Sequence, residues 1–371
     1  MNKKFWATTF TLTGTIIGAG ILGLPFIFAK SGWLAGLFWL IVLGAVMMFV
    51  NLAFGEITLR TRGRHQLSGY AEKYLGTWGK RIMFFAMIFG VYSALLAYLI
   101  GEGESLSRLF PGNINPIFLA ATFWLIMTLL LREGLKGLKK VETWGVIAVI
   151  TIVIGIFIKF LPQIKPSNLM TSNLSQFTLP IGIVMFAFLG FTSIPELRQE
   201  IKGQEKLLKR AIILGSLIPI ILYILFTAVF VGILGNEVTE VATLSFGPII
   251  TILGIFTMLT SYFVLSYSLK DTFKFDLKTS KTINFIFTSF VPLILYIIIA
   301  QYKVLGFASI LGIGGVISVG LTGILILLIG KRAKTSKRNK NDPEIKMPIN
   351  WLIIIILSII FLSGIILQFS H

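Results

Sequence analysis

The residues best suited to binding chemistry lie between Thr13 and Pro25, within an apolar segment long enough to cross a bilayer. This stretch carries four glycines, two threonines and a proline in thirteen residues. In a helix interior each Gly costs about 1 kcal/mol and a Pro about 3 kcal/mol. Freed backbone groups persist at membrane depth only where they line a cavity or are buried in protein. One hypothesis is therefore a broken helix whose bare backbone binds a solute, and the alternative is a glycine face for close helix packing.

A second stretch, 185–196, repeats the spacing from glycine to proline. Gly190 precedes Pro195 by five residues, as Gly20 precedes Pro25. The two stretches lie in the first and sixth apolar segments, and an offset of five spans reverses the orientation of the second segment in the membrane. Interrupted helices at matching positions of an inverted repeat are typical of secondary transporters. The pairing makes close packing the weaker interpretation.

The elements that carry these residues are membrane spans. Of the 371 residues, 56% are hydrophobic and 13% are charged, which is about half the charged share of a soluble domain. The mean hydropathy is +0.90. Because a span needs about 20 apolar residues, the sequence predicts eleven of them, the fourth being short. They are 7–28, 33–59, 82–101, 115–131, 143–161, 177–197, 210–234, 247–269, 282–300, 304–330 and 348–369.

The basic residues indicate the orientation of the spans. Of the 33 lysines and arginines, 28 fall at the N-terminus and in every second loop after it. This asymmetry predicts a cytoplasmic N-terminus and an outer C-terminus. The net charge of +18 then reflects topology and does not indicate nucleic-acid binding. The chain has no cysteine, which excludes disulfides, thiolate chemistry and cysteine-ligated metals.

Four stretches resemble the amino acid–polyamine–organocation transporter superfamily, whose members have a LeuT-like fold. Within it, the sequence is most similar to the aromatic and neutral amino-acid permeases (tryptophan/tyrosine permease-like) and to the amino acid/auxin permeases. The likeness covers the first ten spans. The stretches are Gly14–Pro25, Tyr92–Gly103, Phe186–Glu200 and Thr260–Asp271.

This resemblance implies an all-α membrane protein with a 5+5 inverted repeat, in which spans 1 and 6 are discontinuous. The whole chain, 1–371, would form a single transmembrane transporter domain. Its first repeat is expected over 1–161 and its second over 177–330. The remaining span, 348–369, is expected as an eleventh helix outside the repeats.

An amino-acid substrate brings a carboxylate and an ammonium group, and the N-terminus of a half-helix suits a carboxylate. The resemblance places amides for the carboxylate at the first break and carbonyls for the ammonium group at both breaks. Either Tyr92 or Tyr98 is expected to reach the substrate from span 3. Core packing also explains the phenylalanines of span 6, of which we single out Phe191 as a pocket aromatic. The predicted substrate-binding residues are Thr15, Ile16, Gly18, Ala19, Gly20, Tyr92, Phe186, Ala187, Phe188, Gly190 and Phe191.

The resemblance also implies a Na⁺ site between spans 1 and 8. Its ligands would be the carbonyls of Gly14 and Ile17 and the hydroxyls of Thr260 and Ser261, with Thr257 one turn earlier. In the alternative interpretation, these hydroxyls bond back to carbonyls of their own helix. Related permeases are also driven by protons, so both ions stay open.

Acidic residues near the ends of the spans suggest gates. Glu56, at the cytoplasmic end of span 2, is expected in an interfacial ion pair or an inner gate, and Glu196 beside Arg198 is interpreted in the same way. Glu102 is expected at the outer mouth of span 3, either solvated or in an outer gate.

The predicted function is secondary active transport of a neutral, hydrophobic or aromatic amino acid across the cell membrane by alternating access. Charged substrates are disfavoured because their side chains would need a buried counter-ion. An enzyme is not expected, since the spans lack a His pair, a paired Asp motif and an activated nucleophile. No cofactor or transition metal is expected. A non-transporting sensor in the carrier fold stays open, as do the direction of transport and the oligomeric state.

Overall fold

The computed structural model describes residues 3–63, 65–110, 112, 114–133, 138–275, 279–336 and 343–370, without the side chains of 132–144 and 275. Within these ranges the chain forms helices and no strand. Nine helices of the described chain are long and apolar enough to cross a membrane, or ten if the bent N-terminal pair is one span. A shorter apolar helix, Pro116–Leu131, stands where the short fourth span was predicted.

The helices of the first five spans follow the predicted order, with two departures. The first span is divided into two helices, and the third continues a helix that begins at Leu67 and changes direction at Gly76, whose φ is 77°. The helices are α1 (Lys3–Ile16), α2 (Gly20–Ser31), α3 (Trp33–Arg60), α4 (Leu67–Leu109), α5 (Pro116–Glu133), α6 (Leu138–Phe160) and, in the following connection, the single turn α7 (Pro166–Leu169).

The later spans are interrupted more often. Span 6 contains a 3₁₀ turn, Phe191–Ser193, and spans 9 and 10 contain π turns at Ile286–Phe290 and Gly315–Val319. The helices are α8 (Ile181–Ala187), α9 (Ile194–Glu200), α10 (Leu208–Leu234), α11 (Pro248–Phe275), α12 (Lys281–Phe285), α13 (Val291–Tyr302), α14 (Phe307–Gly314), α15 (Gly320–Thr335) and α16 (Trp351–Gln368).

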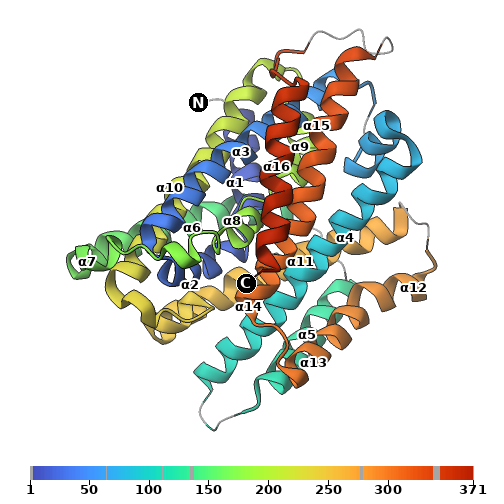
Figure 1. Ribbon diagram of the computed structural model, residues 1–371. Helices are drawn as coiled ribbons and strands as arrows, with labels where there is room; N and C mark the ends of the chain where they lie inside the picture. The colour runs from blue at the N-terminus through green and yellow to red at the C-terminus, as the bar shows by residue number, and fades with distance from the viewer. Residues whose placement is uncertain are drawn as a thin grey trace.

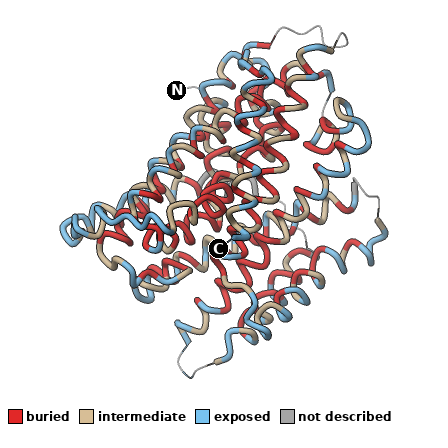
Figure 2. The backbone as a smooth tube through the Cα atoms, viewed as in Figure 1, coloured by how far each residue is buried: buried red, intermediate tan, exposed pale blue. Residues whose placement is uncertain are grey.

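The divided helices lie in the middle of the molecule (Figure 1). α1 packs against α6 and α10, and α8 packs against α2, α3 and α14. Buried residues concentrate on these central elements, whereas the outer helices α5, α12 and α13 carry many exposed ones (Figure 2). Large apolar side chains such as Phe118 and Ile298 are exposed there, as a lipid-facing surface requires.

Glycines let α14 approach α8 backbone to backbone. A Cβ added at Gly182 would lie 2.7 Å from the carbonyl oxygen of Gly312, and one added at Gly315 would collide with the carbonyl oxygen of Gly182. The glycines of span 10 therefore serve close packing, and they hold this span directly against the half-helix that leads into the second break.

Candidate functional site

The structure contains both predicted breaks. α1 ends at Ile16 and α2 begins at Gly20, with a bend of 53° between them. In span 6, α8 ends at Ala187, and the chain passes through an irregular segment and the 3₁₀ turn before α9 begins at Ile194. The prediction of two discontinuous helices is confirmed.

The first break presents backbone donors. The amide of Ala19 donates to the hydroxyl oxygen of Tyr98 over 3.1 Å, and the side chain of Ser261 interacts with the same hydroxyl. The amide of Gly18 donates to the carbonyl oxygen of Ile16 over 3.0 Å. Gly20 begins α2, where the first amides lack intrahelical acceptors and the helix dipole is positive. This end of the break suits an anion. In the structure, the hydroxyl oxygen of Tyr98 is the acceptor for the amide of Ala19.

Backbone acceptors from the two breaks converge on a residue of α10. The hydroxyl of Tyr223 lies 2.9 Å from the carbonyl oxygen of Ile16 and 2.8 Å from that of Ala187, and it shares its proton between them. Ile16 ends α1 and Ala187 ends α8, so both carbonyls belong to the negative ends of helix dipoles. The side chain of Tyr223 is fully buried. This point therefore suits a cationic donor.

The two breaks pack reciprocally through their glycines. A Cβ added at Gly20 would lie 2.6 Å from the Cβ of Ala187, and one added at Gly190 would lie 2.5 Å from the Cγ1 of Ile16. Each glycine thus faces the last residue of the other broken helix. Gly20 lies against the backbone of Ala187, so a larger residue there would need the backbones to separate, whereas at Gly190 it would need the side chain of Ile16 to move.

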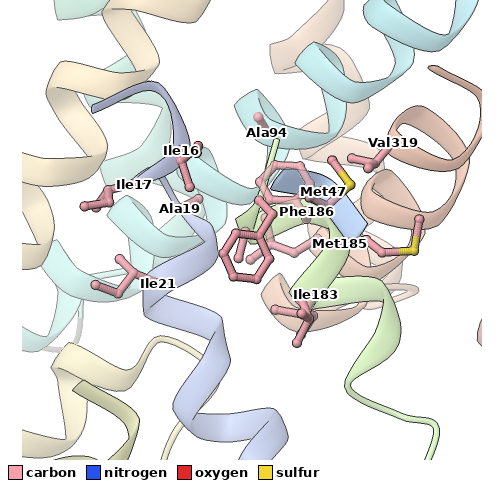
Figure 3. Close-up of a cluster of buried hydrophobic side chains, with 14 of the residues drawn as sticks. Ile16, Ile17, Ala19, Ile21, Met47, Ala94, Ile183, Met185, Phe186 and Val319 are labelled. Carbon is pink, nitrogen blue, oxygen red and sulfur yellow. The ribbon is translucent and has the colours of Figure 1, made fainter. Parts of the chain in front are cut away.

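Apolar side chains surround the breaks. Figure 3 shows Ile16, Ile17, Ala19 and Ile21 of the first break in one buried cluster with Phe186 of α8. Phe188 and Phe191 are 2% and 1% exposed, so neither faces lipid. The ring of Phe188 lies 5.5 Å from that of Tyr223, which places this phenylalanine beside the converging carbonyls.

Two predicted site residues point elsewhere. Tyr92 donates to the carbonyl oxygen of Phe287 over 2.7 Å, toward span 9 and away from the breaks. Tyr98 contacts the first break instead. The two tyrosines are six residues apart and therefore lie on different faces of α4. The hydroxyl of Thr15 donates back to the carbonyl oxygen of Thr11 over 2.8 Å, within its own helix.

The residues predicted to bind Na⁺ are not all brought together. Thr260 is exposed, and its hydroxyl bonds back to Phe256 and Thr257 of its own helix. It therefore does not share a site with Ile17, which is buried. Thr257 also bonds back, to Leu253.

Ser261, the neighbour of Thr260, faces Tyr98 instead. A Na⁺ site built from Gly14, Ile17, Thr257 and Ser261 stays a prediction, but Thr260 lies outside it.

The carboxylate of Glu56 joins separate elements at the C-terminal end of α3. One oxygen lies 2.7 Å from Arg60 Nε and 3.5 Å from Lys334 Nζ, and the other accepts the amide of Met347 over 2.7 Å. Glu56 is 1% exposed. It therefore ties α3 to α15 and to the segment before α16, which agrees with the predicted ion pair.

The second half of span 6, α9, is tied to its neighbours in a similar way. Arg198, which lies on α9 with Glu196, donates to the carbonyl oxygen of Thr61 over 2.9 Å. The hydroxyl of Thr11 on α1 donates to Glu200 over 3.3 Å. The first bond joins α9 to the end of α3, and the second joins the two broken helices.

The structure corrects the prediction that Glu102 is solvated, while its place in an outer gate stays a prediction. Its side chain is completely buried in α4 and is not solvated at an outer mouth. Among the described residues, neither of its carboxyl oxygens has a hydrogen-bond partner.

Sequence reasoning missed Tyr223. It lies in the apolar span 7, outside the stretches that drew attention. A signal existed, since a tyrosine within an apolar span needs a partner for its hydroxyl. The sequence does not say which backbone supplies that partner.

Comparison with known proteins identifies the family. A family model described as the tryptophan/tyrosine permease family matches residues 1–266. The chain belongs to the tryptophan/tyrosine permease family. This permease is a membrane transporter and not an enzyme, as the relatives below also are.

Two curated relatives differ in how much of the permease they match. The permease is 29% identical to tyrosine-specific transport system 1 of Haemophilus influenzae, over 65% of this chain and 61% of that relative. It is 24% identical to glutamine transporter 2 of Aliivibrio fischeri over 93% of this chain and 92% of that relative.

Solved structures confirm the LeuT-like fold of the permease. MhsT in complex with L-phenylalanine superposes with a TM-score of 0.67 at 17% identity, covering 98% of this chain and 97% of that one. A manganese transporter of Eremococcus coleocola gives 0.65 at 14% identity, covering 100% of this chain and 89% of that one. At such identities the likeness concerns the fold alone.

Proposed function

We propose that the permease carries a neutral amino acid with a hydrophobic or aromatic side chain across the cell membrane by alternating access. The observation that carries this proposal is the pairing of opposite poles at the two breaks. The amide of Ala19 donates at one pole, and the carbonyls of Ile16 and Ala187 converge at the other. An α-amino acid has a carboxylate for the first pole and an ammonium group for the second.

Two tyrosine hydroxyls hold these poles in the observed conformation. Tyr98 accepts from the amide, as a carboxylate would, and Tyr223 donates to the carbonyls, as an ammonium group would. Because Gly20 touches Ala187, a substrate enters only when the breaks separate. We infer that the substrate then takes over the backbone partners of these hydroxyls.

The surroundings of the breaks support an apolar side chain on the substrate. The labelled side chains of the cluster in Figure 3 are aliphatic, apart from Met47, Met185 and Phe186. A charged substrate side chain placed there would have no counter-ion, which is costly within a membrane. Among the relatives, the tyrosine-specific transporter favours an aromatic side chain, and the glutamine transporter shares with it a neutral amino-acid substrate.

Transport coupled to Na⁺ or H⁺ is part of the proposal, with the N-terminus in the cytoplasm as the distribution of basic residues predicts. For Na⁺, the remaining candidate ligands are Gly14, Ile17, Thr257 and Ser261, without Thr260, whose hydroxyl is exposed. A change of side-chain rotamer would turn the hydroxyl oxygens of Thr257 and Ser261 away from their present partners and make them free to bind an ion.

Uptake into proteoliposomes tests the proposal. Labelled L-tyrosine, L-tryptophan, L-phenylalanine, L-glutamine and L-lysine are offered under imposed Na⁺ or H⁺ gradients. We expect accumulation of at least one neutral amino acid under one gradient, and no accumulation of L-lysine. Binding without uptake would indicate a sensor, and the absence of binding for every neutral amino acid would overturn the proposed substrate class.

A further inference from the structure

Glu102 is a buried acid that the proposed substrate site does not use. It lies on α4 four residues after Tyr98, and Ser105 follows three residues later. Residues at these spacings share one face of a helix. Glu102 and Ser105 are both 0% exposed. In the described part of the chain, neither the carboxyl oxygens of Glu102 nor the hydroxyl of Ser105 has a hydrogen-bond partner.

The apolar stretches of the elements packed against α4 carry no basic residue. α4 packs against α5, α11, α13, α14, the π turn Gly315–Val319 and α15, and the segments 116–131, 248–268, 291–302 and 307–330 contain no Asp, Glu, Lys, Arg or His. The basic residues of α15 begin at Lys331, and Arg332 donates to the carbonyl oxygen of Tyr74, near the start of α4. At the end of α11, Lys270 donates to the carbonyl oxygen of Leu131.

Other titratable or charged groups on or near these elements are engaged or exposed. They include Tyr98, bound to Ala19; Tyr262, packed on Phe123; Tyr296, beside Glu104; Glu104, beside Glu240; Glu240, bound to the amide of Ala308; Tyr92, bound to the carbonyl of Phe287; and Arg108, Tyr267 and Tyr302, which are exposed.

A carboxylate in this position would be a buried, unpaired charge. Such a charge is far more costly to bury than the neutral acid, and buried groups respond by taking up a proton. The closed conformation, in which the two breaks touch, is therefore compatible with Glu102 only in its protonated form. Closing the carrier and binding a proton become linked events.

We propose that Glu102 is the proton-binding site that couples transport to a proton gradient, a role that rests on the proposed function. When the outer side opens, a hydronium ion transfers its proton to a carboxylate oxygen of Glu102 and leaves as water. The neutral acid then permits the breaks to close around the substrate. When the inner side opens, the acid returns the proton to water. Tyr98, one turn away on the same face, connects this event to the first break.

The test uses full-length protein in proteoliposomes with labelled L-tyrosine, or with whichever neutral amino acid of the panel the wild type accumulates. Glu102→Gln keeps the size of the neutral acid and cannot bind a proton. We expect it to exchange labelled for unlabelled amino acid but to lose accumulation driven by an inward proton gradient. Glu102→Asp, which keeps an acid, should retain that accumulation, and Glu104→Gln is the matched control at an exposed carboxylate.

A second measurement does not depend on transport. In weakly buffered detergent solution, addition of substrate should make the wild type and Glu104→Gln take up protons from a pH indicator, while Glu102→Gln takes up none. Proton-driven accumulation by Glu102→Gln as in the wild type would overturn the assignment. So would wild-type uptake that follows a Na⁺ gradient and ignores the proton gradient, although the proposed function would then stand. A wild type that binds no amino acid would overturn the proposed function itself.

Discussion

At the scale of single residues, the site is defined by two tyrosine hydroxyls that bond to backbone groups of the helix breaks. Tyr98 and Tyr223 each satisfy polar groups that the helix breaks leave free. A buried backbone group without a partner costs about 1–3 kcal/mol. The tyrosines therefore stabilise the substrate-free form, and they do so at the atoms that a substrate would contact.

Tyr98→Phe is predicted to weaken amino-acid binding about tenfold or more. Once the substrate carboxylate has taken over the amide of Ala19, we expect the freed hydroxyl of Tyr98 to donate to that carboxylate. A hydrogen bond to a charged group contributes about 1.5–3 kcal/mol, and 1.4 kcal/mol corresponds to a factor of ten. Binding of labelled amino acid to the purified protein measures the effect. Tyr92→Phe is the control, because its hydroxyl contacts Phe287 on span 9 and its loss should leave affinity near that of the wild type. Equal losses in both variants would contradict the assignment of Tyr98.

Tyr223→Phe is predicted to lower the melting temperature without substrate and to enlarge the stabilisation that substrate produces. Without the hydroxyl, the carbonyls of Ile16 and Ala187 lose their hydrogen-bond donor, at a cost of about 1–3 kcal/mol. The ammonium group of a substrate would restore a donor. Thermal unfolding with and without amino acid measures both effects, with Tyr302→Phe as a control on an exposed tyrosine. A smaller substrate-induced shift than in the wild type would show that Tyr223 remains bound to these carbonyls in the complex.

At the scale of elements, the sequence predicted the breaks because their signal is local. Gly20 with Pro25 and Gly190 with Pro195 mark both interrupted helices within a few residues, and the structure has them there. The partners of these breaks are distant in sequence, since 79 residues separate Ala19 from Tyr98 and 207 separate Ile16 from Tyr223. Choosing between Tyr92 and Tyr98 required the rotation of α4, which its nearly uniform apolar sequence does not specify.

Gly20→Ala is predicted to destabilise the protein and to reduce substrate binding. Alanine favours a helix over glycine by about 1 kcal/mol, but its Cβ would lie 2.6 Å from that of Ala187. Overpacking of this kind costs about 1–3 kcal/mol, so the collision outweighs the gain. Gly155→Ala on α6, where a Cβ meets no described atom within 4 Å, is the matched control and should be neutral or stabilising. The melting temperature and the amino-acid binding of the two variants test this prediction. Wild-type values for Gly20→Ala would mean that the breaks do not touch.

At the scale of the whole molecule, α16 is more than a helix added outside the repeats. Phe361 is fully buried and lies against Gly323 of α15, and Gly364 faces Ile181 at the start of α8. The segment before α16 is bound to Glu56 through the amide of Met347. Hydropathy alone predicted this helix as a span, but it could not predict its contacts with the broken half of the sixth span. Those contacts depend on three-dimensional packing between segments about 180 residues apart.

Glu56→Gln is predicted to loosen the contact between α3, α15 and the segment before α16 and to lower stability by about 1–3 kcal/mol. Removing one partner from a fully buried ion pair costs about 3–5 kcal/mol. Here Arg60 and Lys334 keep 18% and 26% of their side chains exposed, so water compensates part of the loss. Glu72→Gln is the matched control, because its ion pair with Lys80 is exposed on both sides and such pairs contribute about 0–1 kcal/mol. Melting temperatures in the same detergent compare the two variants. If both fell equally, the link from α3 to α15 and α16 would be no stronger than a surface ion pair, and these helix ends would be free to separate without it.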